Sequence, residues 1–157
     1  MPENKVSGLS IRDARLADVE AVLQLWRQAG ATPSVTDTAD DLRRALAAGP
    51  ANVLVADVDG RLVGSIIGAF DGWRGNIYRL AVDPGYRRRG IARALVAEVE
   101  QRLARHGAKR ITALVEKAIP WATGFWPAVG YGLDNRIVRH VRSLSIEATT
   151  SGSGGEK

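Results

Sequence analysis

The chain has 157 residues, of which 45% are hydrophobic and 25% charged, a composition typical of one soluble globular domain. It contains no cysteine, which excludes disulfides, thiolate metal sites and a thiol nucleophile, and His106 and His140 are too far apart to form a zinc motif. We therefore expect no metal. The first ten residues are polar and no apolar run approaches the roughly 18 residues of a membrane span, so we expect a cytoplasmic protein without a membrane partner.

The net charge is +5, from 22 Lys and Arg against 17 Asp and Glu. Most of the arginines are scattered, as on a solvated surface, but Arg87, Arg88 and Arg89 are consecutive and precede Gly90. A nucleic-acid binder would place basic residues along one face with interleaved aromatics, or would carry a helix-turn-helix. The sequence has neither pattern, so we expect no nucleic-acid partner.

The N-terminal third predicts a strand and two helices. Residues 10–15 alternate between apolar and polar side chains, which indicates a strand. Apolar residues at helical spacing then predict a first helix over 19–29. Thr38 and Asp41 resemble a capping box and predict a second helix, which Gly49–Pro50 ends.

The middle of the chain predicts three antiparallel strands. Two β-rich runs, 52–57 and 61–70, are joined by a turn that contains Asp59–Gly60, a strong hairpin signal. A second glycine-rich turn over 71–75 leads into a strand at 77–82.

A long amphipathic helix follows the arginine run. Its apolar stripe is Ile91, Leu95, Val99 and Leu103, and His106–Gly107 supplies its stop. A strand at 111–115 after a short connection completes a right-handed parallel βαβ unit.

The remaining pattern predicts one more helix and one more strand. Pro120 can open a helix that closes before Gly130, and 137–146 indicates a last strand. We expect an α+β domain over 10–147 with a mixed sheet covered by helices, between an N-terminal tail (1–9) and a flexible tail (148–157).

The arginine run stands where a strand turns into a helix, and this position suggests a binding site. The first turn of a helix presents backbone N–H groups without internal partners, and the helix dipole there favours negative charge. Small residues at Gly90 and Ala92 allow an anion to approach the backbone, and the guanidinium groups of the arginines add bidentate contacts to phosphate oxygens. The alternative interpretation is a solvated basic run at the start of a helix. The order of strand, Pro-Gly, three Arg, Gly, Ile and Ala is a more specific pattern than a basic run beside one glycine, and it predicts a pyrophosphate-binding site.

This stretch resembles the acyl-CoA motif of the GNAT superfamily of N-acetyltransferases, which reads Gln or Arg, two variable residues, Gly, one variable residue, then Gly or Ala. Arg87, Gly90 and Ala92 occupy the defined positions, and Leu80 to Pro84 is similar to the fourth strand of the family and its exit. The resemblance extends over about 11–146. It implies a mixed, mostly antiparallel sheet with helices on both faces, whose central parallel strands, 77–82 and 111–115, splay apart to admit acetyl-CoA.

The resemblance also implies roles for individual residues. The backbone of Leu80, Ala81 and Val82 would pair with the pantetheine arm, and the Val82 N–H would stabilise the charge that develops on the thioester oxygen. The residues implied around the cofactor are Arg87, Arg88, Arg89, Gly90, Ile91, Ala92, Arg93 and Phe125.

Acetyl transfer requires a neutral amine, so a group must accept a proton from an acceptor whose reference pKa is near 10.4. Asn76 occupies the position at which some family members carry a basic glutamate, and it cannot serve. Tyr78 and Asp71 are the candidates, directly or through water, although half-buried packing is the simpler interpretation of Tyr78.

The sequence departs from the family pattern a second time, at the residue that would act on the leaving thiolate. Trp126 replaces the tyrosine that protonates the sulfur in many members, and Ile119 replaces a frequent asparagine. An indole N–H donates hydrogen bonds but is not an acid at neutral pH. A thiol with a pKa near 8.5 is a tolerable leaving group without an acid. Trp126 is therefore expected to donate a hydrogen bond to the sulfur or to line the cofactor site.

The acceptor side is defined least by the sequence. Trp73 and Asp71 are expected to contact the substrate, whereas Phe125 and Tyr131 pack by default in the core. Asp71 and Glu116 are the carboxylates that could make the cleft acidic. A protein N-terminus or lysine, a polyamine, an amino acid and an antibiotic amine all remain open as acceptors, as does a homodimer, which is common in the family. The alternative function is a CoA-binding regulatory module with little or no catalysis.

Overall fold

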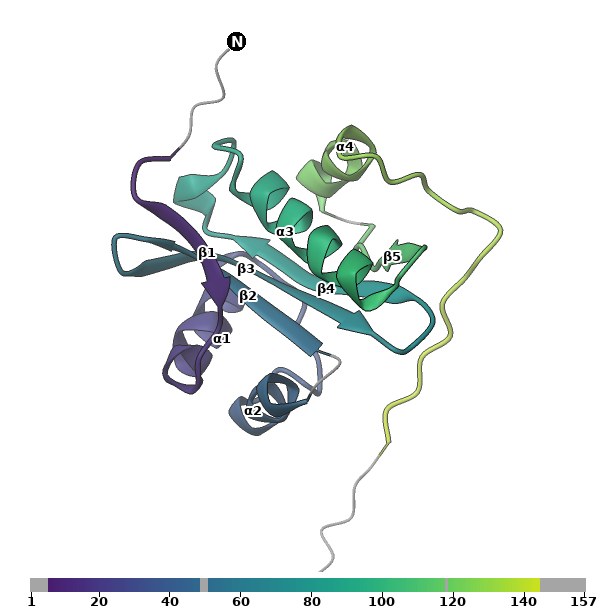
Figure 1. Ribbon diagram of the computed structural model, residues 1–157, viewed down its shortest axis with the longest axis horizontal. Coiled ribbons are helices and arrows are strands. Elements are labelled where there is room, and N and C mark those ends of the chain that lie inside the picture. Colours follow the sequence, from purple (N-terminus) through teal and green to yellow (C-terminus); the bar gives the residue numbers. More distant parts are fainter. Residues whose placement is uncertain (1–5, 49–50, 118, 145–157) are drawn as a thin grey trace, which may run out of the picture.

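In the part of the chain that the structure describes, the sheet has five strands in the order β1-β2-β3-β4-β5 (Figure 1). The structure is a computed structural model and describes residues 6–48, 51–117 and 119–144. The strands are β1 (Leu9–Asp13), β2 (Ala51–Val58), β3 (Arg61–Phe70), β4 (Gly75–Val82) and β5 (Ile111–Ala113). The first four pair antiparallel, and β5 pairs parallel with β4.

Helices cover both faces of this sheet (Figure 1). One face carries α1 (Val19–Gln28) and α2 (Ala39–Ala47), and the other carries α3 (Ile91–His106) and α4 (Pro120–Ala128). Two hydrophobic clusters fill the two layers, one centred on α3 and the other on α1. The predicted α+β class, with a mixed, mostly antiparallel sheet, is confirmed. None of the helices in the described part of the chain is long and apolar enough to cross a membrane.

Local signals produce the predicted helix start and hairpin. The Thr38 hydroxyl oxygen accepts the Asp41 N–H at 3.1 Å and so caps α2. In the β2–β3 turn, Asp59 and Gly60 have φ values of +50° and +88°, as the two central residues of a type I′ hairpin require.

Three glycines of the sheet allow α3 to pack closely. A Cβ atom added at Gly68 would lie 2.7 Å from a methyl of Val99, and one at Gly75 would lie 2.9 Å from a methyl of Leu103. At Gly64 the nearest side-chain atom, from Leu95, lies at 3.0 Å. The apolar stripe of α3 thus rests on glycines of β3 and β4, which fixes where the helix begins relative to the end of β4.

A bulge interrupts β4 before its C-terminal end. Between the pairs Ser65–Ala81 and Ile67–Tyr78, β3 advances two residues and β4 three. Arg79 lies in this bulge with a φ of +52°, an uncommon conformation for a residue other than glycine.

Strands β4 and β5 separate after a short ladder. Their register covers Gly75 to Ile77, and one further bond runs from the Leu114 N–H to the Ile77 carbonyl at 3.2 Å. The strand predicted at 111–115 therefore ends at Ala113, and β4 continues to Val82 without a described strand on that side.

The predicted last strand over 137–146 is wrong for 137–144, which has no strand pairing, while 145–146 lies outside the described residues. The segment has a β-rich composition, but no strand of the described chain pairs with it, and composition alone does not form a strand. As a consequence β5 is the edge of the described sheet, not a central strand. Residues 1–5 of the predicted N-terminal tail and the flexible tail at 148–157 also lie outside the described residues.

Candidate active site

The candidate site lies where β4 ends and α3 begins. Buried Asp83 shapes this connection: its carboxylate accepts the Gly85 N–H at 2.8 Å and pairs with Arg61 at 3.1 Å. A short 3₁₀ turn, Pro84–Tyr86, follows and carries the chain toward Gly90.

Gly90 opens α3 in a left-handed conformation, with φ +80° and ψ +7°. No heavy atom of the described residues lies within 4 Å of a Cβ built there, so the space beside its backbone is open. None of the side chains that the structure describes caps the helix, whose first internal bond runs from the Ala94 N–H to the Gly90 carbonyl at 3.0 Å. The N–H groups that precede Ala94 in α3 therefore lack internal helical partners, as an anion site requires.

The three consecutive arginines point to different surroundings. Arg88 and Arg89 are exposed, and the guanidinium of Arg89 lies 5.2 Å from the ring centre of Tyr86. Arg87 turns inward: it donates to the Ala29 carbonyl at 3.1 Å, and its guanidinium lies 5.9 Å from the Trp121 ring centre. Its buried Nε has no hydrogen-bond partner among the described residues. A buried donor without a partner is costly, so this one marks a position that suits an acceptor atom of a ligand.

The direction of the Val82 N–H follows from the ladder. The Asp83 N–H donates to the Val63 carbonyl on β3 at 2.8 Å. Successive N–H groups of a strand point to opposite edges, so the Val82 N–H points away from β3. It therefore faces the gap that opens between β4 and the chain past the end of β5. The side chains of Ala81 and Val82 are buried, in the two clusters on opposite faces of the sheet.

Aromatic residues of α4, together with Tyr131 just after it, pack in the hydrophobic cluster that contains the α3 side chains. Trp126 is buried, with its ring 5.3 Å from Phe125 and 5.0 Å from Tyr131, both in edge-to-face arrangements. Trp121 contacts Phe125 in the same way at 5.7 Å. Burial, and then the nearby Glu100 carboxylate, raises the pKa of Tyr131, so its phenol stays protonated at neutral pH.

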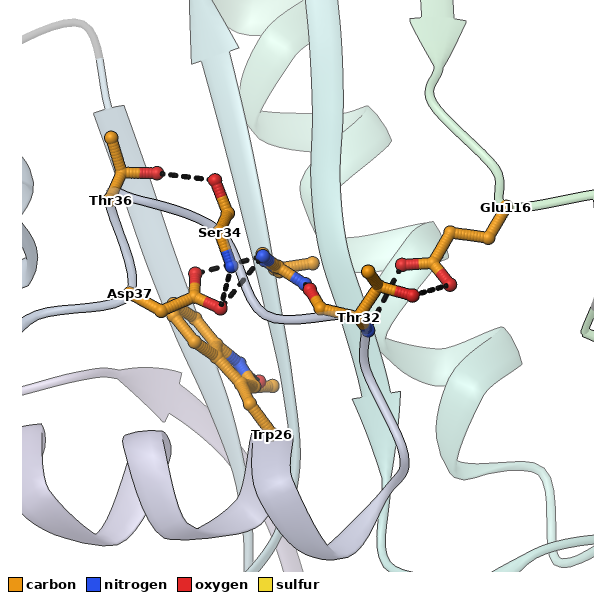
Figure 2. A network of polar contacts seen from close by, with 8 residues as sticks. Trp26, Thr32, Ser34, Thr36, Asp37 and Glu116 are labelled. Carbon is orange, nitrogen blue, oxygen red and sulfur yellow. Dashed lines mark hydrogen bonds and ion pairs between the residues drawn. The ribbon is translucent and has the colours of Figure 1, made fainter. Parts of the chain in front are cut away.

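A polar network fixes the α1–α2 loop over the bulge of β4 (Figure 2). Both Asp37 carboxylate oxygens accept from Arg79 Nη2 at 2.8 Å, and Arg79 Nη1 donates to the Thr32 carbonyl at 3.0 Å. The same guanidinium lies 5.4 Å from the ring centre of Trp26, whose Nε1 donates to the Ser65 hydroxyl at 2.9 Å. The left-handed Arg79 is thereby held in place from several sides.

Glu116, in the segment after β5, joins this network through Thr32. In Figure 2 it approaches Thr32 from the segment after β5, and its carboxylate accepts the Thr32 N–H at 3.2 Å and the Thr32 hydroxyl at 2.8 Å. Sequence reasoning identified Glu116 but not its partner, nor the pair of Arg79 and Asp37. These contacts join residues 42 to 84 positions apart, and no local pattern signals them.

Two residues predicted at the acceptor side lie far from the Val82 end of β4. Asp71 and Trp73 are in the β3–β4 turn, at the opposite end of β4 from Val82, roughly 23 Å away along eight residues of strand. The Asp71 carboxylate accepts the Arg74 and Trp73 N–H groups at 2.8 Å each, which lowers the pKa of Asp71 and makes it a weaker base. Trp73 is 71% exposed and stacks under Arg74. Tyr78 lies one residue past the β4–β5 ladder and is 37% exposed.

Comparison with known proteins identifies the family. The model of the acetyltransferase (GNAT) family matches residues 19–131. The chain belongs to the GNAT family. An acetyltransferase of Pectobacterium atrosepticum is 37% identical over 123 residues, which cover 78% of this chain and 87% of that protein. An acetyltransferase of Yersinia pestis is 33% identical over 130 residues, covering 83% and 92%.

Solved GNAT structures share the fold at lower identity. The aminoglycoside N-acetyltransferase AAC(6')-Iy, in complex with the bisubstrate analogue CoA-S-monomethyl-acetylneamine, aligns with a TM-score of 0.72 and 19% identity over 88% of this chain and 100% of that one. The PaiA N-acetyltransferase of Thermoplasma acidophilum, in complex with coenzyme A, aligns with a TM-score of 0.73 and 17% identity over 80% and 91%.

Proposed function

We propose that this protein is an N-acetyltransferase that moves the acetyl group of acetyl-CoA to a primary amine by direct attack on the thioester. The observation that carries this proposal is the open, left-handed Gly90 at the uncapped start of α3, which follows the end of β4 after the short Pro84–Tyr86 turn. Relatives in the GNAT family named as acetyltransferases, and the CoA complexes of structural neighbours, support the choice of cofactor.

The chain offers a diphosphate two kinds of contact. The N–H groups of Ile91, Ala92 and Arg93 are free of helical bonds and would donate to phosphate oxygens, with the exposed side chains of Arg88 and Arg89 at the rim. We infer that Arg87, whose Nε lacks a partner, completes the site from the inner side. Leu80, Ala81 and Val82 would hold the pantetheine arm along the free edge of β4, with Phe125 packed against it.

Acetyl-CoA supplies an activated acetyl group, and the chain has to stabilise its transfer. The Val82 N–H, which points to the gap, would donate to the thioester oxygen as the amine nitrogen bonds to the carbonyl carbon. The carbon–sulfur bond then breaks, and a thiolate with a pKa near 8.5 leaves without an obligatory acid. Trp126 would line this region as a buried indole that is not an acid. We propose that Tyr78, which is partly exposed, relays the proton of the amine to solvent water.

The acceptor would enter on the side of the α1–α2 loop, beside Glu116. Its carboxylate is exposed, and its present partners, the Thr32 N–H and hydroxyl, are neutral donors. An ammonium group would form a stronger, charge-assisted bond to the same oxygens. Cationic amines with a second amino group are therefore the acceptor class that this carboxylate favours.

Release of free CoA thiol over a panel of diamines, amino acids and aminoglycosides tests the proposal. We expect thiol release that depends on the amine, and a Glu116→Gln variant with a raised KM for the cationic acceptor and an unchanged KM for acetyl-CoA. Asp71→Asn, in the distant turn, is the matched control and is expected to change neither constant. CoA binding without transfer to any amine would instead support a regulatory CoA-binding module, an alternative motivated by Trp126 in place of the usual tyrosine.

A further inference from the structure

Lysines are scarce in this chain, although basic residues are not. Of its 22 Lys and Arg residues, four are lysines: Lys5, Lys109, Lys117 and Lys157. The structure describes Lys109 and Lys117, and both are exposed. An arginine guanidinium is always protonated, whereas a lysine amine can lose its proton and attack an acyl carbon. Lysines are therefore the basic side chains that the proposed acetyl transfer could modify.

Contacts of the neighbouring Glu116 place Lys117 close to the gap beside β4. Glu116 accepts the Thr32 N–H at 3.2 Å and the Thr32 hydroxyl at 2.8 Å (Figure 2). The Thr32 carbonyl in turn accepts from Arg79 Nη1 at 3.0 Å. Arg79 precedes Val82 by three residues of β4, a span of roughly 10 Å. The segment that carries Lys117 is thus tied to the part of β4 where the thioester would lie.

The Lys117 amine is available for a reaction in this gap. Within the described residues it has no ion-pair partner, although the adjacent Glu116 is a carboxylate. The Glu116 carboxylate is instead engaged by Thr32. A lysine carries its amine on a flexible four-carbon stem of roughly 6 Å, which can swing toward the gap without a change in the backbone.

We propose that the protein acetylates its own Lys117 within the same molecule, an inference that rests on the proposed function. The Lys117 ammonium first loses a proton to solvent water. Its Nζ then bonds to the carbonyl carbon of the acetyl group, while the Val82 N–H donates to the carbonyl oxygen, and the carbon–sulfur bond breaks. The new amide nitrogen loses a second proton and the thiolate takes one up. The products are acetyllysine, the free thiol of CoA and one proton released to solvent.

Acetylation would change the charge beside the proposed acceptor carboxylate. The Lys117 ammonium repels a cationic acceptor that binds to Glu116, whereas acetyllysine is neutral. Two unit charges roughly 7 Å apart in water interact with about the thermal energy, which changes an affinity by roughly threefold. We expect the modified protein to bind cationic amines more tightly by this factor, so that the first turnover prepares the site for the acceptor.

Mass spectrometry of the full chain after incubation with acetyl-CoA, without an added amine, tests this proposal. Lys109 is the matched internal control: the carbonyl of Arg110 next to it accepts the Gly75 N–H at 3.0 Å, which places Lys109 at the far end of β4. We expect Lys117 to be acetylated at least about tenfold faster than Lys109, because of the two only Lys117 lies near the proposed site. Peptide mapping measures both rates in one sample. Equal rates would overturn the proposal.

Gly90→Glu chains separate the intramolecular step from its alternatives. This variant, in which CoA binding is expected to be weaker, should acetylate Lys117 more slowly at limiting acetyl-CoA and Lys109 at the wild-type rate. When it is mixed with wild type, from which its mass distinguishes it, it should gain acetyl groups at Lys117 no faster than it does alone. Faster acetylation in the mixture would show transfer between molecules and refute the intramolecular step.

A diamine assay in parallel distinguishes failure of this inference from failure of the proposed function. Thiol release with the diamine, while Lys117 stays unmodified, would overturn self-acetylation and leave the proposed function intact. No transfer to Lys117 or to any amine would overturn both. For the charge effect, Lys117→Gln should have a KM for the diamine roughly threefold below that of Lys117→Arg, and equal KM values would refute this effect.

Discussion

Replacing Gly90 with glutamate separates cofactor binding from stability. Gly90 has φ +80°, where any residue with a Cβ is strained by about 1–2 kcal/mol. Within the described chain an added Cβ meets no heavy atom within 4 Å, so steric clash does not add to this cost. Gly90→Ala and Gly90→Glu are therefore expected to lose the same stability, about 1–2 kcal/mol, and Gly90→Ala is the matched control.

The two variants differ in charge at the proposed diphosphate site. A carboxylate about 4 Å from one phosphate charge is repelled by about 4 kcal/mol at an effective dielectric of 20. If exposure to solvent halves this repulsion, about 2 kcal/mol remains, which corresponds to roughly 30-fold weaker binding. Calorimetric titration with CoA is expected to give this ratio between Gly90→Glu and Gly90→Ala, while urea unfolding gives equal free energies. Dissociation constants within threefold of each other would refute the placement of the diphosphate.

Other consequences follow from the packing, the ion pairs and the aromatic cluster. Gly68→Ala would bring a methyl within 2.7 Å of Val99 and is expected to lower the free energy of unfolding by about 1–3 kcal/mol. Gly124→Ala, in open space on α4, should leave the free energy of unfolding equal or raise it by up to about 1 kcal/mol. Urea unfolding measures both variants, and equal losses would contradict the close contact of α3 with the sheet. Hydrogen bonds from Arg12 lower the pKa of Asp18 below its ordinary 3.8, so the carboxylate stabilises the fold above that pH and this contribution disappears as the pH falls through the lower folded pKa. The difference in unfolding free energy between wild type and Asp18→Asn should hence be constant above about pH 5 and vanish toward about pH 2, and a difference that persists there would be inconsistent with the ion pair. Trp126→Phe is expected to reduce kcat less than tenfold, because the indole is not an acid and a general acid contributes ~10²–10⁴-fold; a loss of 100-fold or more in kcat, with unchanged CoA affinity, would show a direct catalytic role.

Elements with local signals could be predicted from the sequence. The β2–β3 hairpin follows from Asp59–Gly60, which adopt the two positive φ angles of its turn, and α2 begins at the predicted cap, Thr38. The start of α3 at Gly90 was equally visible, since a left-handed residue before an apolar stripe is best supplied by glycine. In each case a few neighbouring residues contain the whole physical cause.

Features that depend on distant partners could not be predicted. The strand expected at 137–146 has a β-rich composition, but a strand forms only where another strand pairs with it, and pairing is not encoded locally. The Arg87 guanidinium was predicted to contact phosphate oxygens, and no sequence pattern indicated that it also donates to the carbonyl of Ala29, 58 residues earlier. The contact of Glu116 with Thr32 spans 84 residues, so the sequence identified a carboxylate without showing what it faces.

A crystal structure of the full chain with CoA tests the central proposal most directly. It is expected to show the diphosphate within hydrogen-bond distance of the N–H groups of Ile91, Ala92 and Arg93, and the pantetheine arm along β4 at Leu80 to Val82. Diphosphate density at any other place, with the start of α3 bound only to water or protein, would contradict it.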